Sequence, residues 1–223
     1  MNHISFGYLG EKMNDYIKTL ADAKKLDISL KPNRWKFDSN PYIISGPCSV
    51  ESEEMIVDWA HKMKNVGVNA LRGGAYKPCT YPITQEVGEN GWKEGLREDG
   101  LRFLKTAREE TGLPIVSEIM DSNQITESTM DCIDIVQVGT RNFQNYTLLD
   151  ALGELDIPIL LKRGTWGTID EILGAVERIL VRGNEKVAIC LRGVVGAPSY
   201  RHVFPSIRWA PDLMMIPALK ELC

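Results

Sequence analysis

The sequence predicts an α/β protein of the TIM-barrel type, a (β/α)8 barrel of which about six of the eight βα units are present in the chain. Three observations support this prediction. From residue 42 onward, short apolar runs alternate with amphipathic stretches, which is typical of parallel strands covered by helices. The runs are apolar almost throughout, so both faces of each strand are expected to be buried. Polar residues and glycines follow these runs, where barrel enzymes place their active sites.

The expected elements follow one another along the chain in a regular order. Residues 1–40 are predicted to be an N-terminal extension, with a helix at 11–25 and a polar connector, and residues 41–223 a partial barrel domain. The strands are expected at 42–45, 67–72, 114–118, 133–138, 158–162 and 186–191. The helices that alternate with them are expected at 53–65, 98–111, 122–130, 146–152 and 169–182. A further helix-like stretch ends the chain.

Composition narrows the function classes. The chain has 223 residues, 43% of them hydrophobic, with a net charge of −4, so it can form one full core and carries no general polyanion-binding surface. We therefore expect no nucleic-acid partner. Apolar runs are too short to cross a membrane and the N-terminus lacks a secretion signal, which indicates a cytoplasmic protein with no membrane partner. Five cysteines without a CxxC pair argue against a disulfide framework or structural zinc.

Basic residues gather at the expected carboxyl ends of the strands, although the protein as a whole is acidic. They are Arg72, Lys77, Arg141, Lys162, Arg163 and Arg192. Guanidinium groups bind two anion oxygens at once and lysine adds a point charge, so this cluster suits a phosphorylated or carboxylated small substrate. The alternative is that each basic residue pairs with a neighbouring carboxylate. No GxGxxG or GxxxxGK[ST] motif follows the first strand, which argues against a Rossmann or P-loop site.

Three other residues at strand ends carry chemistry. Cys48 follows the first strand, where a thiolate could act as a metal ligand or a nucleophile; a buried inert thiol is the alternative. Glu118 and Gln137 are polar residues that close apolar strands, so each needs a partner or a ligand, and structural hydrogen bonding is the alternative for both. His202 is the only histidine near this group in sequence order, and the three histidines of the chain do not form a metal-ligand cluster.

Five motifs together resemble one enzyme family. They are Ser-Gly-Pro-Cys-Ser-Val-Glu at 45–51, Leu-Arg-Gly-Gly-Ala-Tyr-Lys-Pro at 71–78, Gln-Val-Gly-Thr-Arg-Asn at 137–142, Leu-Lys-Arg-Gly at 161–164 and Cys-Leu-Arg-Gly at 190–193. This order resembles the compact microbial branch of the 3-deoxy-D-arabino-heptulosonate 7-phosphate (DAHP) synthases, over about residues 42–222. The octulosonate phosphate synthases share the architecture, but the run around Lys77-Pro78 is more similar to the heptulosonate group.

The resemblance implies a metal-dependent transferase, a homo-oligomer that condenses phosphoenolpyruvate with erythrose 4-phosphate to give DAHP. This reaction is the first step of the shikimate pathway to aromatic amino acids. Lys77 and Glu118 would be catalytic, Glu118 by positioning the water that adds to the substrate, and Cys48 would be one ligand of a divalent ion of the Mn, Fe, Co or Zn class. The residues expected to bind substrate are Arg72, Lys77, Thr80, Arg141, Lys162 and Arg192. Arg163 would point outward or contribute to the local field.

The sequence departs from the family pattern in two places. Cys79 stands where the family has an arginine that contacts the aldose phosphate, so a different aldose phosphate is an alternative acceptor. The other metal ligands come in the family from the last two strands, beginning with an Asp-Pro-Ser-His motif that does not occur in this chain. We therefore expect a C-terminally incomplete synthase, with little condensation activity of this chain alone. A phosphoenolpyruvate-binding pseudoenzyme or subunit without the metal centre is the alternative.

Overall fold

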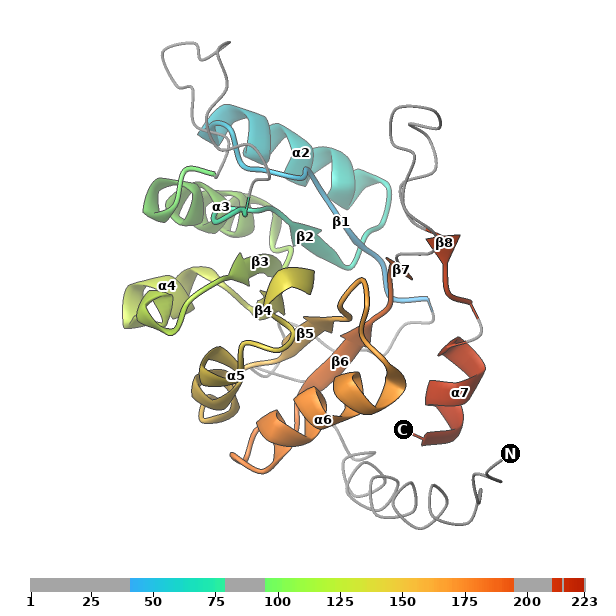
Figure 1. Ribbon diagram of the computed structural model, residues 1–223. Helices are drawn as coiled ribbons and strands as arrows, with labels where there is room; N and C mark the ends of the chain where they lie inside the picture. The colour runs from blue at the N-terminus through green and yellow to red at the C-terminus, as the bar shows by residue number, and fades with distance from the viewer. Residues whose placement is uncertain (1–40, 79–94, 195–209, 214, 223) are drawn as a thin grey trace, which may run out of the picture.

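The computed structural model describes residues 41–78, 95–194, 210–213 and 215–222. Its centre is a curved sheet of six parallel strands that lie side by side in sequence order (Figure 1). The strands are β1 (Ile44–Ser45), β2 (Ala70–Arg72), β3 (Ile115–Ile119), β4 (Ile135–Val138), β5 (Ile159–Lys162) and β6 (Val187–Cys190). Sequential parallel strands are the arrangement of a (β/α) barrel wall, so the predicted fold class is confirmed.

Helices connect the strands and cover one side of the sheet (Figure 1). They are α2 (Glu53–Asn65), α3 (Glu98–Thr111), α4 (Glu127–Cys132), α5 (Tyr146–Gly153) and α6 (Ile169–Leu180), with short 3-10 turns η2 (Ser122–Gln124) and η3 (Thr140–Asn142). Local sequence fixes their ends. The Ser52 hydroxyl accepts a hydrogen bond from the Met55 amide at the start of α2, and α3 ends at Gly112 with a φ of 73°, which are favoured start and stop signals.

Each expected strand is present but begins up to three residues later than expected, the largest difference being β2, expected at 67–72 and observed at Ala70–Arg72. The expected helices agree closely with the structure except in one segment. The helix expected at 122–130 is two separate elements, η2 and α4. Asp121 caps η2 through the Asn123 amide, and Thr126 caps α4 through the Thr129 amide. Because the second cap requires extended backbone at Thr126 (φ −115°, ψ 159°), the helical path is interrupted before it.

The sheet separates two apolar clusters. The larger cluster lies between the sheet and the helices and includes Ile115 and Ile119 of β3. The smaller cluster lies on the opposite face and contains Ala70, Val116 and Ile135 as its buried members. Side chains of a strand alternate between its faces, which explains why neighbouring residues of β3 enter different clusters. Tyr42, Ile44 and Leu160 pack against the smaller cluster.

The described part of the chain also contains a small antiparallel pair, β7 (Gly193–Val194) with β8 (Ala210–Pro211), followed by helix α7 (Met215–Leu222). The helix-like stretch expected near residue 223 is α7, whereas the β7–β8 pair was not predicted. The expected extension at 1–40 lies outside the described residues. None of the helices in the described ranges is both long and apolar enough to cross a membrane.

Candidate active site

Four polar side chains form a layer above the smaller apolar cluster, at the carboxyl end of the sheet. In each of β2 to β5, a polar residue stands two positions after a residue that belongs to, or packs on, that cluster, so strand alternation places both on the same face. These pairs are Ala70 and Arg72, Val116 and Glu118, Ile135 and Gln137, and Leu160 and Lys162. The sequence-predicted strand-end residues are therefore brought to one face.

Glu118 is a buried carboxylate with one oxygen satisfied and one not. It is directly opposite Gln137 in the parallel register of β3 and β4. The Gln137 amide donates to Glu118 Oε2 over 2.7 Å, whereas Oε1 has no hydrogen-bond partner, and the residue is only 7% exposed. Burial raises the pKa of Glu118, and the charges of Lys162, Arg72 and Arg141 together with the Gln137 hydrogen bond oppose that rise.

Gly139 leaves the space that this carboxylate occupies. A Cβ atom at Gly139 would lie 2.0 Å from Glu118 Oε1, far inside van der Waals contact. Gly139 follows β4 two positions after Gln137, so both residues belong to the same face. The absence of a side chain here is therefore a requirement of the observed Glu118 position.

Lys162 brings a cation into this layer at the end of β5. Burial lowers the pKa of Lys162, and the nearby Arg72 acts in the same direction, while Cys190 and Glu118 oppose the change. A half-buried lysine beside another cation is electrostatically costly unless an anion is bound. The arrangement thus favours a negatively charged ligand.

The loop after β1 contributes Cys48 to the edge of the site. Arg72 Nη1 donates to the carbonyl oxygens of Pro47 and Cys48, both over 3.1 Å. The pKa of the Cys48 thiol is lowered, chiefly by its hydrogen bond with Lys77 and then by the Lys77 charge and by Arg72, with burial acting against them. Cys48 is exposed, so the alternative of a buried inert thiol is wrong.

Two further arginines reach the same end of the sheet through the turn η3. The Arg192 side chain donates from Nη1 to the Thr140 hydroxyl over 3.0 Å. Arg141 is exposed, contacts the Pro78 carbonyl over 3.5 Å, and lies close enough to Glu118 to influence its pKa. Thr140 is therefore a supporting residue to which the sequence analysis gave no role, although it lies within one of the motifs, because its partner lies 52 residues further along the chain.

Arg163 does not belong to this cluster. Its side chain is 8% exposed and pairs with Asp212 over 2.7 Å, while its Nε donates to the Gly167 carbonyl over 2.8 Å. Of the two expectations for Arg163, the first agrees with the structure in that the side chain points away from the site, although it is buried against the half-buried Asp212 rather than exposed to solvent. Strand alternation explains the outcome, since Arg163 follows Lys162 and faces the other way.

Some predicted residues cannot be placed. Thr80, Cys79 and His202 lie outside the described residues. Across the described ranges, no three histidine, cysteine, aspartate or glutamate side chains are grouped so that they could hold a metal ion. Cys48 is thus a single candidate ligand with cations beside it, and these ranges alone do not form a metal centre.

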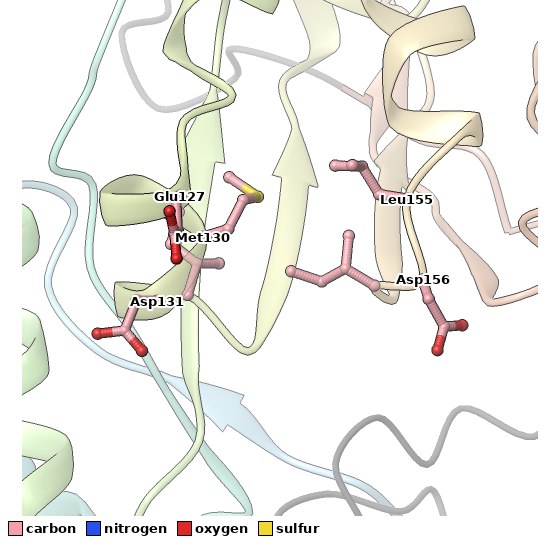
Figure 2. A pocket seen from close by; sticks show the side chains of 7 residues that line it. Glu127, Met130, Asp131, Leu155 and Asp156 are labelled. Carbon is pink, nitrogen blue, oxygen red and sulfur yellow. The ribbon is translucent and has the colours of Figure 1, made fainter.

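A pocket of about 470 Å³ lies at the opposite end of the sheet. Its lining residues precede β4 and β5, so it opens at the amino ends of these strands. Figure 2 shows carboxylates of Glu127, Asp131 and Asp156 around the apolar Met130 and Leu155. Asp131 pairs with Lys105 over 2.7 Å and Asp156 pairs with Lys186. Because barrel enzymes use the carboxyl end, this pocket is separate from the candidate active site.

Comparison with known protein families supports the resemblance seen in the motifs. Residues 32–213 match the profile described as the DAHP synthetase I family. A phospho-2-dehydro-3-deoxyheptonate aldolase from Thermotoga maritima is 41% identical over 152 residues, covering 68% of this chain and 42% of that protein. A 2-dehydro-3-deoxyphosphooctonate aldolase from Syntrophotalea carbinolica is 28% identical over 151 residues, covering 68% of this chain and 54% of that protein.

Solved structures give the same result. The crystal structure of a DAHP synthase from Thermotoga maritima superimposes with a TM-score of 0.69 at 35% identity, covering 81% of this chain and 48% of that one. A truncated form of 3-deoxy-D-arabino-heptulosonate 7-phosphate synthase from the same organism gives a TM-score of 0.67, also at 35% identity, covering 81% of this chain and 60% of that one. The chain spans about half the length of the curated relatives it matches.

Proposed function

Because this chain belongs to the DAHP synthetase I family, we propose that it acts in the condensation of phosphoenolpyruvate with erythrose 4-phosphate to give DAHP, the first step of the shikimate pathway. The observation that carries this proposal is the layer of cations around one buried carboxylate at the carboxyl end of the sheet. Phosphoenolpyruvate bears a phosphate and a carboxylate on a small frame, which suits several cations converging from different strands.

The cations that we propose to bind phosphoenolpyruvate come from separate elements of the fold. Arg72 and Lys162 lie on the sheet itself, and the residues in the loops close around them. The full proposed set is Arg72, Lys77, Arg141, Lys162 and Arg192, with Thr80 as a further substrate contact. Anion binding would offset the cost of holding Lys162 beside Arg72, so the ligand and the cluster stabilise each other.

The reaction requires one new carbon–carbon bond and one water. C3 of phosphoenolpyruvate bonds to the aldehyde carbon, whose oxygen takes a proton from Lys77. Water bonds to C2 and gives one proton to Glu118, which leaves a hydroxyl on C2. The C2–O bond to phosphate then breaks as the hydroxyl proton passes to the departing phosphate, which forms the ketone and inorganic phosphate, and the proton on Glu118 returns through solvent to Lys77. A carboxylate whose pKa is raised by burial is suited to accept this proton. Orientation and charge stabilisation supply the remaining catalysis.

The family is generally metal-dependent, and we propose a divalent ion of the Mn, Fe, Co or Zn class with Cys48 as one ligand. The described residues offer no group of three metal-binding side chains, so they do not fit such an ion by themselves. We accordingly assign no step to the metal. On the same family basis we propose a cytoplasmic homo-oligomer, which size-exclusion chromatography with light scattering would test.

The acceptor is tested by incubating the chain with phosphoenolpyruvate, Mn²⁺ and one of two aldoses, erythrose 4-phosphate or a five-carbon aldose phosphate. Release of inorganic phosphate and the mass of the product are measured. We expect little condensation by this chain alone, because the Asp-Pro-Ser-His motif that begins the family's other metal ligands does not occur in it, and any product formed from erythrose 4-phosphate is expected to have seven carbons. Exclusive formation of an eight-carbon product would assign the chain to octulosonate synthesis. Phosphoenolpyruvate binding without condensation is expected both of an incomplete synthase and of the pseudoenzyme alternative, whereas robust product formation would show that the expectation about the missing ligands is wrong. Absence of phosphoenolpyruvate binding would contradict the proposal.

A further inference from the structure

Gln137 is placed so that its side chain can hold the carboxylate of Glu118 in one orientation. It is 2% exposed and lies directly across the β3–β4 register from Glu118. Its amide nitrogen donates to Glu118 Oε2 over 2.7 Å. A carboxylate held through one oxygen by a buried amide loses rotational freedom about its terminal torsion, which is otherwise broad. The hydrogen bond therefore fixes the direction of the second oxygen.

The second oxygen is directed toward Gly139. Glu118 Oε1 is buried, has no hydrogen-bond partner, and occupies the position within 2.0 Å of where a Cβ of Gly139 would stand. A buried polar atom without a partner is costly, and such atoms in native proteins call for an explanation. Here Gly139, which has no side chain, leaves space for Oε1. This oxygen can therefore accept a hydrogen bond from a ligand.

We propose that Gln137 and Gly139 are positioning residues that together present a single carboxylate oxygen, Glu118 Oε1, to the water and substrate of the reaction. The Gln137 amide binds Oε2, so that this oxygen cannot compete with Oε1 for the water and substrate. Gly139 provides the space that Oε1 occupies. This inference rests on the proposed function for the identity of the reaction. The contact between Gln137 and Glu118, however, can be tested without it.

Other charged groups also act on Glu118, and the test must separate them from Gln137. Lys162 approaches from β5, Arg72 from β2 and Arg141 from η3. Each favours the ionised carboxylate, as does the amide hydrogen bond. Replacing Gln137 alone leaves these three charges in place, so a change in the titration of Glu118 reports the lost hydrogen bond.

The test is a carboxyl ¹³C NMR titration of the full chain labelled at glutamate, in which the Glu118 resonance is identified by its absence in Glu118→Gln. In Gln137→Met, which keeps the side-chain size but removes the donor, we expect the Glu118 midpoint to move to higher pH. An unchanged midpoint would overturn the proposal. If that variant does not fold, Gln137→Glu takes its place, and the second carboxyl must also raise the midpoint.

Gly139→Ala tests the other half of the proposal. Phosphoenolpyruvate added to the wild-type chain is expected to shift the Glu118 resonance, and the added methyl group should abolish that shift while calorimetry finds the phosphoenolpyruvate affinity changed by less than about threefold. Where the chain turns over, the rate should fall by about a hundredfold because of the misplaced carboxylate. If the Glu118 resonance of Gly139→Ala still shifted on addition of phosphoenolpyruvate, the proposed role of Gly139 in making space for Oε1 would be contradicted.

A matched control comes from a part-buried contact between the segment after η3 and helix α6. Gln144 donates to Glu171 over 2.9 Å, another amide-to-carboxylate bond. Gln144→Met should leave the Glu118 midpoint and the phosphoenolpyruvate response unchanged, and an equal effect in this variant would overturn the assignment to Gln137. If the wild-type chain does not bind phosphoenolpyruvate, the proposed function fails, whereas the Gln137→Met titration still decides whether the amide holds Glu118.

Discussion

The charged side chains at the two ends of the parallel sheet differ in whether their partners come from the protein itself. At the amino end, Asp131, Asp134 and Asp156 each pair with a lysine or an arginine of the protein. At the carboxyl end, three of the proposed binding cations act on one buried carboxylate, which keeps an oxygen without a hydrogen bond. The same strands therefore have an amino end at which charges are paired within the protein and a carboxyl end at which the excess of cations favours binding of an anion from solution. In barrel enzymes this division separates stability from catalysis.

The amino end is held by a buried ion pair. Asp134 Oδ2 accepts from Arg108 Nη1 over 3.1 Å and from the Ile115 amide over 2.9 Å. Arg108 also donates to the Asp131 carbonyl over 2.7 Å. The pair thus connects α3 with the starts of β3 and β4, and each group has more than one partner. Removing one partner of such a pair is strongly destabilising, because the other charge is left buried and uncompensated.

The largest expected effect is from breaking that pair. Asp134→Ala leaves the Arg108 guanidinium buried without its carboxylate, so we expect the free energy of unfolding to fall by about 3–5 kcal/mol. Urea denaturation followed by circular dichroism measures it. A loss below about 1 kcal/mol would show that the amino end does not depend on this pair. The variant should keep its phosphoenolpyruvate affinity wherever it remains folded.

At the carboxyl end, Glu118 is expected to reduce stability at neutral pH. Its pKa in the folded protein is raised above the ordinary value of 4.5. Its contribution to stability is therefore fully present below that ordinary value and is lost as pH rises through the folded-state pKa. Glu118→Gln should remove this loss, so the variant should gain stability over wild type as pH increases from 4 to 8. Urea midpoints across this range give the comparison, and a constant difference would contradict it.

A smaller effect is expected at Lys162. Lys162→Met removes a half-buried cation beside Arg72, so the free energy of unfolding should stay the same or rise. Thermal and urea unfolding of the ligand-free chain would detect it. Clear destabilisation would mean that Lys162 is a structural partner of Glu118 and that the two ends of the sheet do not differ as argued.

The smallest effect is expected on the helical surface. Lys62 and Asp58 form an ion pair on α2 with side chains 60% and 56% exposed. Asp58→Ala should change stability by no more than about 0.5 kcal/mol. The variant serves as a reference for solvent-exposed charge, and an effect as large as that of Asp134→Ala would remove the contrast between buried and exposed pairs.

Much of the fold and site could be predicted because both follow from local patterns. Apolar runs identified the six strands, and the residues that close them identified Arg72, Glu118, Gln137 and Lys162. The ion pair of Arg163 could not be predicted, because its partner, Asp212, lies 49 residues away along the chain. No local pattern indicates such a pair. The break between η2 and α4 arises because the chain uses two caps in succession, Asp121 and Thr126, and the helical pattern does not indicate the second.

Gly139 shows a different limit. The sequence places a glycine after the fourth strand, but glycines at strand ends are common and have several uses. Its role emerges only when the Glu118 carboxylate is seen to lie where a Cβ would stand. Positions defined by the absence of an atom require coordinates, whereas charged residues at strand ends can be recognised from the sequence.

The most direct test of the central claim compares one lysine from each end of the sheet. Phosphoenolpyruvate is titrated calorimetrically into wild type, Lys162→Met at the carboxyl end, and Lys186→Met at the amino end, where the lysine pairs with Asp156. We expect Lys162→Met to weaken binding by about tenfold or more, as for loss of a charged contact, and Lys186→Met to bind like wild type. Equal binding by all three proteins, or weaker binding only in Lys186→Met, would contradict the assignment of the anion site to the carboxyl end.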